Sequence, residues 1–237
     1  MQVSGGFEWR ASYLREGWKG RASIAFLGFV LYWLMQVAGG YVFRESSGEF
    51  LVVVGAHLVA CIVMVLLFCL LRRMHPIGNR FKGEGFSSKA LWMGLASVAL
   101  LYVASYAFSK WIGQPPEPFM QQFMSALQAG SIYNSGILLF LILVLAPLGE
   151  ELAFRHFLIN LFAFKKTFWR YAAILFSALL FTAIHWQYSF KTTLVSLFVL
   201  ALMLAIARLA TGGLLLPMIM HGFAGLLAVG LYPFFYS

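Results

Sequence analysis

Long, almost uninterrupted apolar runs dominate the chain. A helix needs about 20 mostly apolar residues to cross a hydrocarbon core of about 30 Å. A membrane β-barrel instead shows alternating segments of about 10 residues, so the continuous runs exclude it. We therefore predict an all-α polytopic transmembrane helical bundle with about seven spans, at 22–43, 50–71, 90–109, 136–164, 171–188, 192–207 and 214–235.

The composition supports the same class of protein. Of the 237 residues, 62% are hydrophobic and 11% are charged, against about 45–50% and about 25% in soluble domains. The net charge of +9 comes from basic residues in loops beside the spans, so we expect no nucleic-acid partner. The positive-inside rule places the N-terminus in the cytoplasm and the C-terminus outside. We expect the membrane to be the bacterial inner (plasma) membrane. Only Arg44, Lys110 and Lys191 then fall on the outer side.

The segments between the spans suggest a division of the chain. Residues 1–21 mix aromatic and basic residues, which favours an interfacial segment. Residues 22–135 read as supporting helices and loops, and residues 136–237 as the core in which the chemistry is concentrated. The first span lacks a small-residue cleavage site after it, so we expect it to remain as an anchor. In 113–135, an apolar stripe at four-residue spacing predicts a helix that caps the bundle on the outer side or, as the less favoured reading, gates a site.

Three full charges lie in one apolar helix, in the sequence Ala-Pro-Leu-Gly-Glu-Glu-Leu-Ala-Phe-Arg that ends at Arg155. Each charge costs about 2.5–3.5 kcal/mol on insertion scales. Glu151 and Arg155 have the spacing of a structural ion pair on one helix face. Glu150 is turned by about 100° from Glu151, so it cannot pair with Arg155 as easily. It is therefore the carboxylate that we expect to take part in chemistry. Pro147 predicts a kink or local opening beside it.

Two histidines reach the same predicted depth as Glu150. Lys165 lies 15 positions after Glu150, Arg170 lies 15 before His185, and Arg208 lies 13 before His221. At 1.5 Å per residue, all three lie about 20–22 Å from the cytoplasmic side. A common level favours a shared site over isolated core histidines. His57, His75 and His156 receive no role, and the two cysteines of the second span, Cys61 and Cys69, are read as buried hydrophobes.

These motifs resemble those of the CAAX protease and bacteriocin-processing (CPBP) family, which includes the type II CAAX prenyl endopeptidases. The family pattern is Glu-Glu-x-x-x-Arg, then Phe-x-x-x-His, then His-x-x-x-Asn or a similar polar residue. The chain has the first at Glu150 to Arg155 and the second at Phe181 to His185. The third begins at His221 but has Gly225 at its polar position.

The resemblance implies an intramembrane endopeptidase acting on a membrane-associated protein or peptide. Glu150 and His185 would activate a water molecule, and His221 would help to stabilise the oxyanion, while Glu151, Arg155 and Phe181 support the site. A glutamate beside imidazoles can act as a general base. Losing the donor at Gly225 would cost about 10²–10³ in rate unless another group replaces it.

Several alternatives stay open. Glu150, His185 and His221 could together bind zinc with water in the fourth position, although a metal-free glutamate mechanism is equally compatible with the resemblance. Gly225 also suits a weakly active or inactive relative that serves as a membrane immunity or regulatory binding protein. Buried charges mark proton-coupled transporters too, but the chain shows no evident inverted repeat. The apolar walls leave the substrate unnamed.

Overall fold

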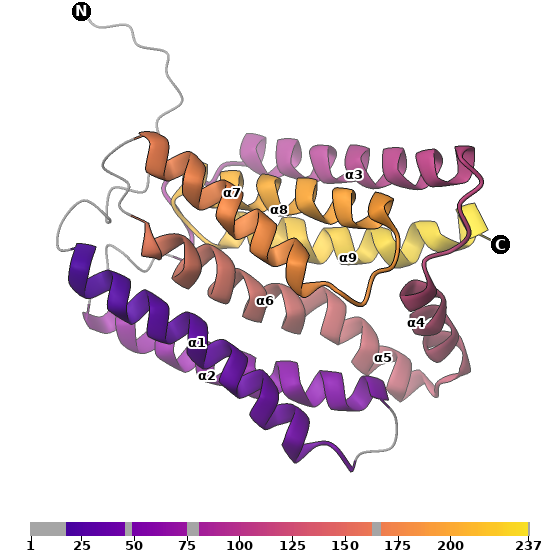
Figure 1. The fold of residues 1–237 in the computed structure, drawn as a ribbon, viewed down its shortest axis with the longest axis horizontal. Coiled ribbons are helices and arrows are strands. Elements are labelled where there is room, and N and C mark those ends of the chain that lie inside the picture. The colour runs from indigo at the N-terminus through magenta and orange to yellow at the C-terminus, as the bar shows by residue number, and fades with distance from the viewer. Residues whose placement is uncertain (1–17, 46–48, 75–80, 163–166, 237) are drawn as a thin grey trace, which may run out of the picture.

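The computed structural model of the protein describes residues 18–45, 49–74, 81–162 and 167–236 (Figure 1). Every regular element in these ranges is helical. In chain order the elements are α1 (Trp18–Val42), α2 (Glu49–Met74), α3 (Ser88–Trp111), α4 (Pro118–Ala129), α5 (Ile132–Phe140), η2 (Leu141–Leu145), α6 (Ala146–Glu150), η3 (Glu151–Phe157), η4 (Leu158–Leu161), α7 (Thr167–Ile184), α8 (Lys191–Thr211) and α9 (Leu215–Tyr236).

Seven of the described helical segments are long and apolar enough to cross a membrane, which confirms the predicted all-α polytopic bundle. The predicted spans agree with them to within a few residues. The span predicted at 171–188 ends earlier, at Ile184, because the chain leaves the helix at His185. The interfacial segment predicted for 1–21 lies mostly outside the described residues, since the structure describes the chain from Trp18 onward.

The bundle is arranged around the span Ile132–Leu161, which runs from α5 through η4. Helices α1 and α2 lie side by side on one side of this central span, and α7, α8 and α9 lie on the other, with α3 outermost against α8 and α9 (Figure 1). Helix α4 sits at the end of the bundle where α9 ends. We call this the α4 end. Helix α4 also confirms the helix predicted within 113–135.

The central span is not a regular α-helix. The segments η2 and η3, on either side of α6, have π-helical geometry, and the N–H of Ala146 bonds to the carbonyl of Leu141, five residues earlier. Pro147 has no N–H to donate to the carbonyl four or five residues before it, that of Leu143 or Ile142. The predicted local opening beside Glu150 is therefore present, and π-helical turns of this kind are common at functional sites.

Candidate active site

One cavity of about 430 Å³ collects the residues that the sequence assigned to chemistry. Glu150, His185 and His221 all contribute to its wall, and so does Phe181. They come from the central span, the end of α7 and the second turn of α9. The common depth inferred from the flanking basic residues therefore corresponds to a common cavity.

Glu150 is the last residue of α6 and only 7% exposed. Its Oε1 lies 3.7 Å from Nε2 of His57, and its Oε2 lies 3.8 Å from Nε2 of His221. Both distances suit ion pairs but exceed the range of a direct hydrogen bond. Oε2 accepts no hydrogen bond from the described residues. The carboxylate is thus held between two imidazoles with acceptor capacity left over.

Glu151 links Arg155 to His221. Its Oε2 lies 3.4 Å from Nε of Arg155, in the ion pair that the sequence predicted, and its Oε1 lies 2.9 Å from Nδ1 of His221. Glu151 and Arg155 are both fully buried. The guanidinium also donates to the carbonyl of Ala201 at 3.2 Å and lies 4.5 Å from the ring centre of Phe181. Glu151 therefore orients the imidazole of His221 as well as pairing with Arg155.

His185 follows the last residue of α7, which ends at Ile184. Its Nδ1 lies 2.7 Å from the carbonyl oxygen of Phe181. Because a carbonyl only accepts, Nδ1 carries the proton, and Nε2 of the neutral ring is an acceptor. Burial lowers the pKa of His185 below its ordinary value. The ring also packs at 4.5 Å from the ring of Phe181, which fixes its direction.

His57 is the site residue that the sequence interpretation left without a role. It lies on α2, lines the same cavity and has its Nδ1 2.9 Å from the carbonyl oxygen of Val53. One turn later, Cys61 donates from Sγ to the carbonyl of Leu145 at 2.9 Å, which holds α2 against the central span. A usable signal was present, because Arg72 lies 15 positions after His57, the same depth count that identified Glu150 and His185.

The other histidines are not brought to this cavity. His156 is buried, with its ring against those of Phe68 and Phe157, and it is absent from the cavity wall. His75 lies outside the described residues. Cys61 and Cys69 are free thiols; Cys61 is buried as expected, whereas Cys69 is exposed on the surface of α2.

Gly225, at the polar position of the third motif, makes a close backbone contact. A Cβ at this residue would lie 2.8 Å from the carbonyl oxygen of Ile142, and a Cβ at Gly222 would lie 2.7 Å from that of Leu143. These are the two carbonyls to which Pro147 cannot donate. The pair of glycines therefore lets α9 approach the opened turn of the central span, where weak Cα–H···O contacts are favourable.

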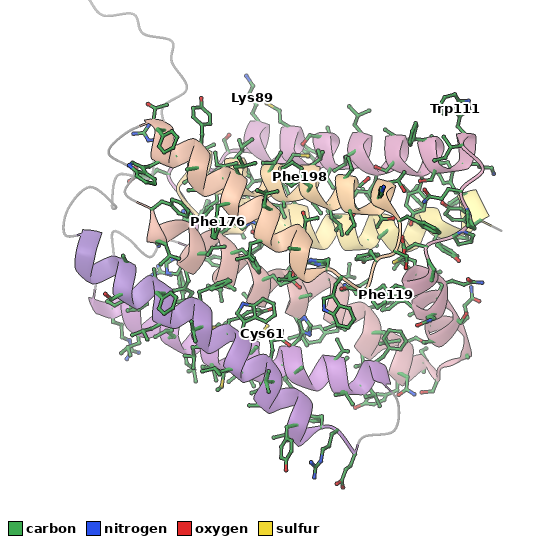
Figure 2. The ribbon with its side chains drawn as sticks, viewed as in Figure 1. Cys61, Lys89, Trp111, Phe119, Phe176 and Phe198 are labelled. Carbon is green, nitrogen blue, oxygen red and sulfur yellow. The ribbon has the colours of Figure 1, made fainter. Side chains whose placement is uncertain are left out.

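Helix α4 covers the cavity from the α4 end. Phe119, Met120 and Phe123 contribute to the cavity wall, and the ring of Phe119 packs edge-on against Tyr188 at 5.3 Å. Figure 2 shows Phe119 inside the bundle, beside the loop that joins α7 to α8, whereas Trp111 projects outward from the end of α3. The carboxylate of Glu117 anchors this cover, accepting from the N–H of Ser189 at 2.7 Å and the hydroxyl of Thr193 at 2.8 Å.

Comparison with known proteins links the part of the chain that holds most of this site to a family. Residues 132–227 match the family model described as "Type II CAAX prenyl endopeptidase Rce1-like". An uncharacterized 24.3 kDa protein of Escherichia coli is 35% identical over 130 residues, which are 55% of this chain and 58% of that protein. The chain thus spans less than two thirds of this relative. No solved structure matches the chain. The match over residues 132–227 confirms the resemblance to the CAAX protease and bacteriocin-processing family that the three motifs indicated.

Proposed function

We propose that the protein is an intramembrane endopeptidase that hydrolyses peptide bonds of a membrane-associated protein or peptide. The observation that carries this proposal is the position of Glu150, a buried carboxylate between imidazoles in one cavity of a membrane bundle. An ionisable group in such a place is costly and marks function by default. The family match supports the same class of reaction.

In the proposed reaction, Glu150 and His185 activate a water molecule. The water donates hydrogen bonds to the carboxylate of Glu150 and to Nε2 of neutral His185, and its oxygen attacks the carbonyl carbon of the peptide bond. Glu150 takes the proton that the water loses. When the C–N bond breaks, Glu150 returns this proton to the departing amine, so the products are a carboxylic acid and an amine, and the acid then gives its proton to the amine. General base catalysis of this kind contributes about 10²–10⁴ in rate.

His221 is proposed to stabilise the oxyanion. Its Nδ1 is held at 2.9 Å from Glu151, which leaves Nε2 directed into the cavity, 3.8 Å from Glu150. A ring that carries protons on both nitrogens donates from Nε2 to the oxygen of the tetrahedral intermediate. Arg155 stays 3.4 Å behind Glu151 and supports this orientation.

Zinc does not fit the described arrangement as a ready ligand set. Among the residues that the structure describes, no three His, Cys, Asp or Glu side chains are grouped so that they could hold a metal ion. We therefore derive no step through a metal. Zinc bound by Glu150, His185 and His221 stays a prediction, which the metal content of the purified protein tests.

For the whole protein we propose a place in the bacterial inner membrane, with the N-terminus in the cytoplasm and the α4 end outside. The positive-inside distribution of basic residues supports this orientation. The substrate class is proposed as CAAX-type proteins or bacteriocin-like and pheromone-like peptides. All of these present a peptide bond close to the membrane, where the cavity lies.

The proposal is tested by comparing the new peptide termini in membranes of cells that contain wild-type protein, Glu150→Gln or His185→Ala. We expect termini that appear only with the wild type. Identical termini in all three samples would contradict the proposal, provided that the variants accumulate to the same level.

Gly225 favours a second candidate function, that of a weakly active relative that acts as a membrane immunity or regulatory protein. The supporting observation is the tight contact at Gly225, which excludes the polar side chain of the family motif. In that case, the biological effect of the protein would survive His185→Ala.

A further inference from the structure

His57 contributes a polar group to the site from outside the stretch that matches the family. It belongs to α2, whereas the match begins at residue 132. Its side chain is 18% exposed, and its Nε2 lies 3.7 Å from Oε1 of Glu150. Nδ1 is engaged by the carbonyl of Val53 at 2.9 Å, so the ring is oriented with Nε2 toward the carboxylate. An apolar helix has no packing reason to aim an imidazole at a buried glutamate.

The site also lacks one donor. The third motif places a polar side chain one turn after its histidine, and the chain has Gly225 there. The contact between Gly225 and the carbonyl of Ile142 leaves no room for such a side chain without moving α9. Among the residues of α9 that line the cavity, His221 alone has a side-chain donor, so a second donor for the oxyanion has to come from another helix.

We propose that His57 supplies this second donor. The inference rests on the proposed protease function and adds a residue to its site. As the water oxygen bonds to the carbonyl carbon, the carbonyl π electrons move onto oxygen, and N–H groups of His57 and His221 donate to it. Because Nδ1 of His57 donates to the carbonyl of Val53, this role requires the imidazolium form of the ring, with a second proton on Nε2 that faces the carboxylate of Glu150. That proton is shared in the hydrogen bond to the oxyanion and stays on the ring. Breaking the C–N bond restores the carbonyl and releases both donors.

The test uses a fluorogenic peptide that spans the cleavage site identified from the new termini. We expect His57→Ala to lower kcat by about 10²-fold, as loss of one oxyanion donor does, with KM changed by less than about threefold. His57→Gln keeps an N–H donor at a similar reach and should recover at least about a tenth of the wild-type kcat. Leu58→Ala, a change at the neighbouring, more exposed position, serves as the matched control and should leave both constants unchanged.

The outcomes separate this inference from the proposed function. If wild-type protein cleaves and His57→Ala has the same kcat, the donor role of His57 is wrong and the protease function stands. If His57→Gln is as slow as His57→Ala although both have the wild-type Tm, the donor role is also wrong. If wild-type protein yields no peptide terminus that is absent with Glu150→Gln, the protease function is wrong, and the proposed role of His57 is wrong with it.

A second pocket, of about 100 Å³, adjoins the cavity at the α4 end. Its wall is rich in hydroxyl groups, and Ser105 of α3 hydrogen-bonds there to Ser196 of α8 at 2.7 Å. The walls of the pocket and the cavity share Tyr102, Met120, Tyr188, Leu197 and Ala228. Buried water needs two to four polar partners and a few tens of Å³ of space, and this pocket offers both.

The geometry points to this pocket as the route by which water reaches Glu150. The inference rests on its own observation, a hydroxyl-lined space that adjoins the cavity holding Glu150. Tyr188 stands at the junction, since its ring stacks on that of His185 with 6.2 Å between centres. Hydrolysis consumes one water molecule per bond, so a site inside an apolar bundle needs such a path.

Cysteine accessibility tests the route without relying on proteolysis. In a Cys61→Ser, Cys69→Ser background, Ser196→Cys should react with a charged, water-soluble methanethiosulfonate at least about ten times faster than Val195→Cys, because the reactive thiolate requires water. Val195 is the neighbour on the same helix and is 61% exposed on the outer face of the bundle. Ser105→Cys repeats the test on the facing helix. Equal or slower labelling at both pocket positions would overturn the route.

Discussion

The stretch that matches the family and the first three spans contribute differently to the cavity. Residues 132–227 hold the buried glutamates Glu150 and Glu151 and two of the three imidazoles around Glu150. Helices α1 and α2 hold no buried carboxylate among their described side chains, yet they supply His57, Tyr32 and Gln36 to the cavity wall. The difference teaches that a family motif can carry the charged centre of a site while helices outside it provide further polar contacts. The division into supporting and catalytic parts therefore stays a prediction.

The largest effect on stability should come from the centre of the matched stretch. Arg155→Ala removes the partner of Glu151 and leaves a fully buried carboxylate without its cation. Breaking one side of a buried pair costs about 3–5 kcal/mol. Thermal unfolding in detergent should show a large loss of Tm, and cleavage should disappear with it. An unchanged Tm would show that the pair is not structural. The control is Arg44→Ala, which removes the exposed ion pair between Arg44 and Glu45.

Replacing Gly225 should give the next largest effect. Gly225→Asn restores the side chain of the family motif but forces it against the carbonyl of Ile142. Overpacking of this kind costs about 1–3 kcal/mol, so we expect a lower Tm and no gain in cleavage. Gly230→Asn, on the same helix with open space around it, should cost much less. Faster cleavage after Gly225→Asn would show that the glycine only deprives the site of a hydrogen-bond donor and is not required for packing.

A smaller effect is expected on the side of the cavity formed by α1. Tyr32→Phe removes the hydroxyl that accepts from Nε2 of Gln36 at 2.9 Å. The net value of such a hydrogen bond is about 1 kcal/mol, and cleavage should change by less than about threefold. A double-mutant cycle with Gln36→Leu measures the coupling. A loss of cleavage comparable to that of His57→Ala would move Tyr32 into the chemistry.

The smallest expected change is in the pH profile. His185 must be neutral to accept from water, and its pKa lies below the ordinary value because the ring is buried. Activity should therefore persist as pH falls through about 6.5 and be lost only at lower pH. The rate of peptide cleavage against pH tests this, with His185→Gln as the variant that lacks the imidazole. An acid limb centred at or above about 6.5 would contradict the assignment.

Much of this architecture could be predicted because apolar spans and their charges are local features. The seven spans, the Glu151–Arg155 pair and the shared level of Glu150, His185 and His221 all follow from spacing along single helices. His57 was overlooked because its motif is uninformative, although the same depth count applied to it. The contact at Gly225 depends on how α9 meets the carbonyls freed by Pro147, which no spacing rule contains. The link from Glu151 to His221 likewise joins two helices.

The most direct measurement of the central claim follows hydrolysis by purified protein in liposomes, in water labelled with ¹⁸O. Wild-type protein should place one ¹⁸O atom in the new carboxyl terminus of the peptide. Glu150→Gln should lower the rate of this incorporation by about 10²–10⁴, whereas Glu117→Gln, at a buried glutamate outside the matched stretch, should keep most of it. Incorporation by Glu150→Gln at the wild-type rate would contradict the account.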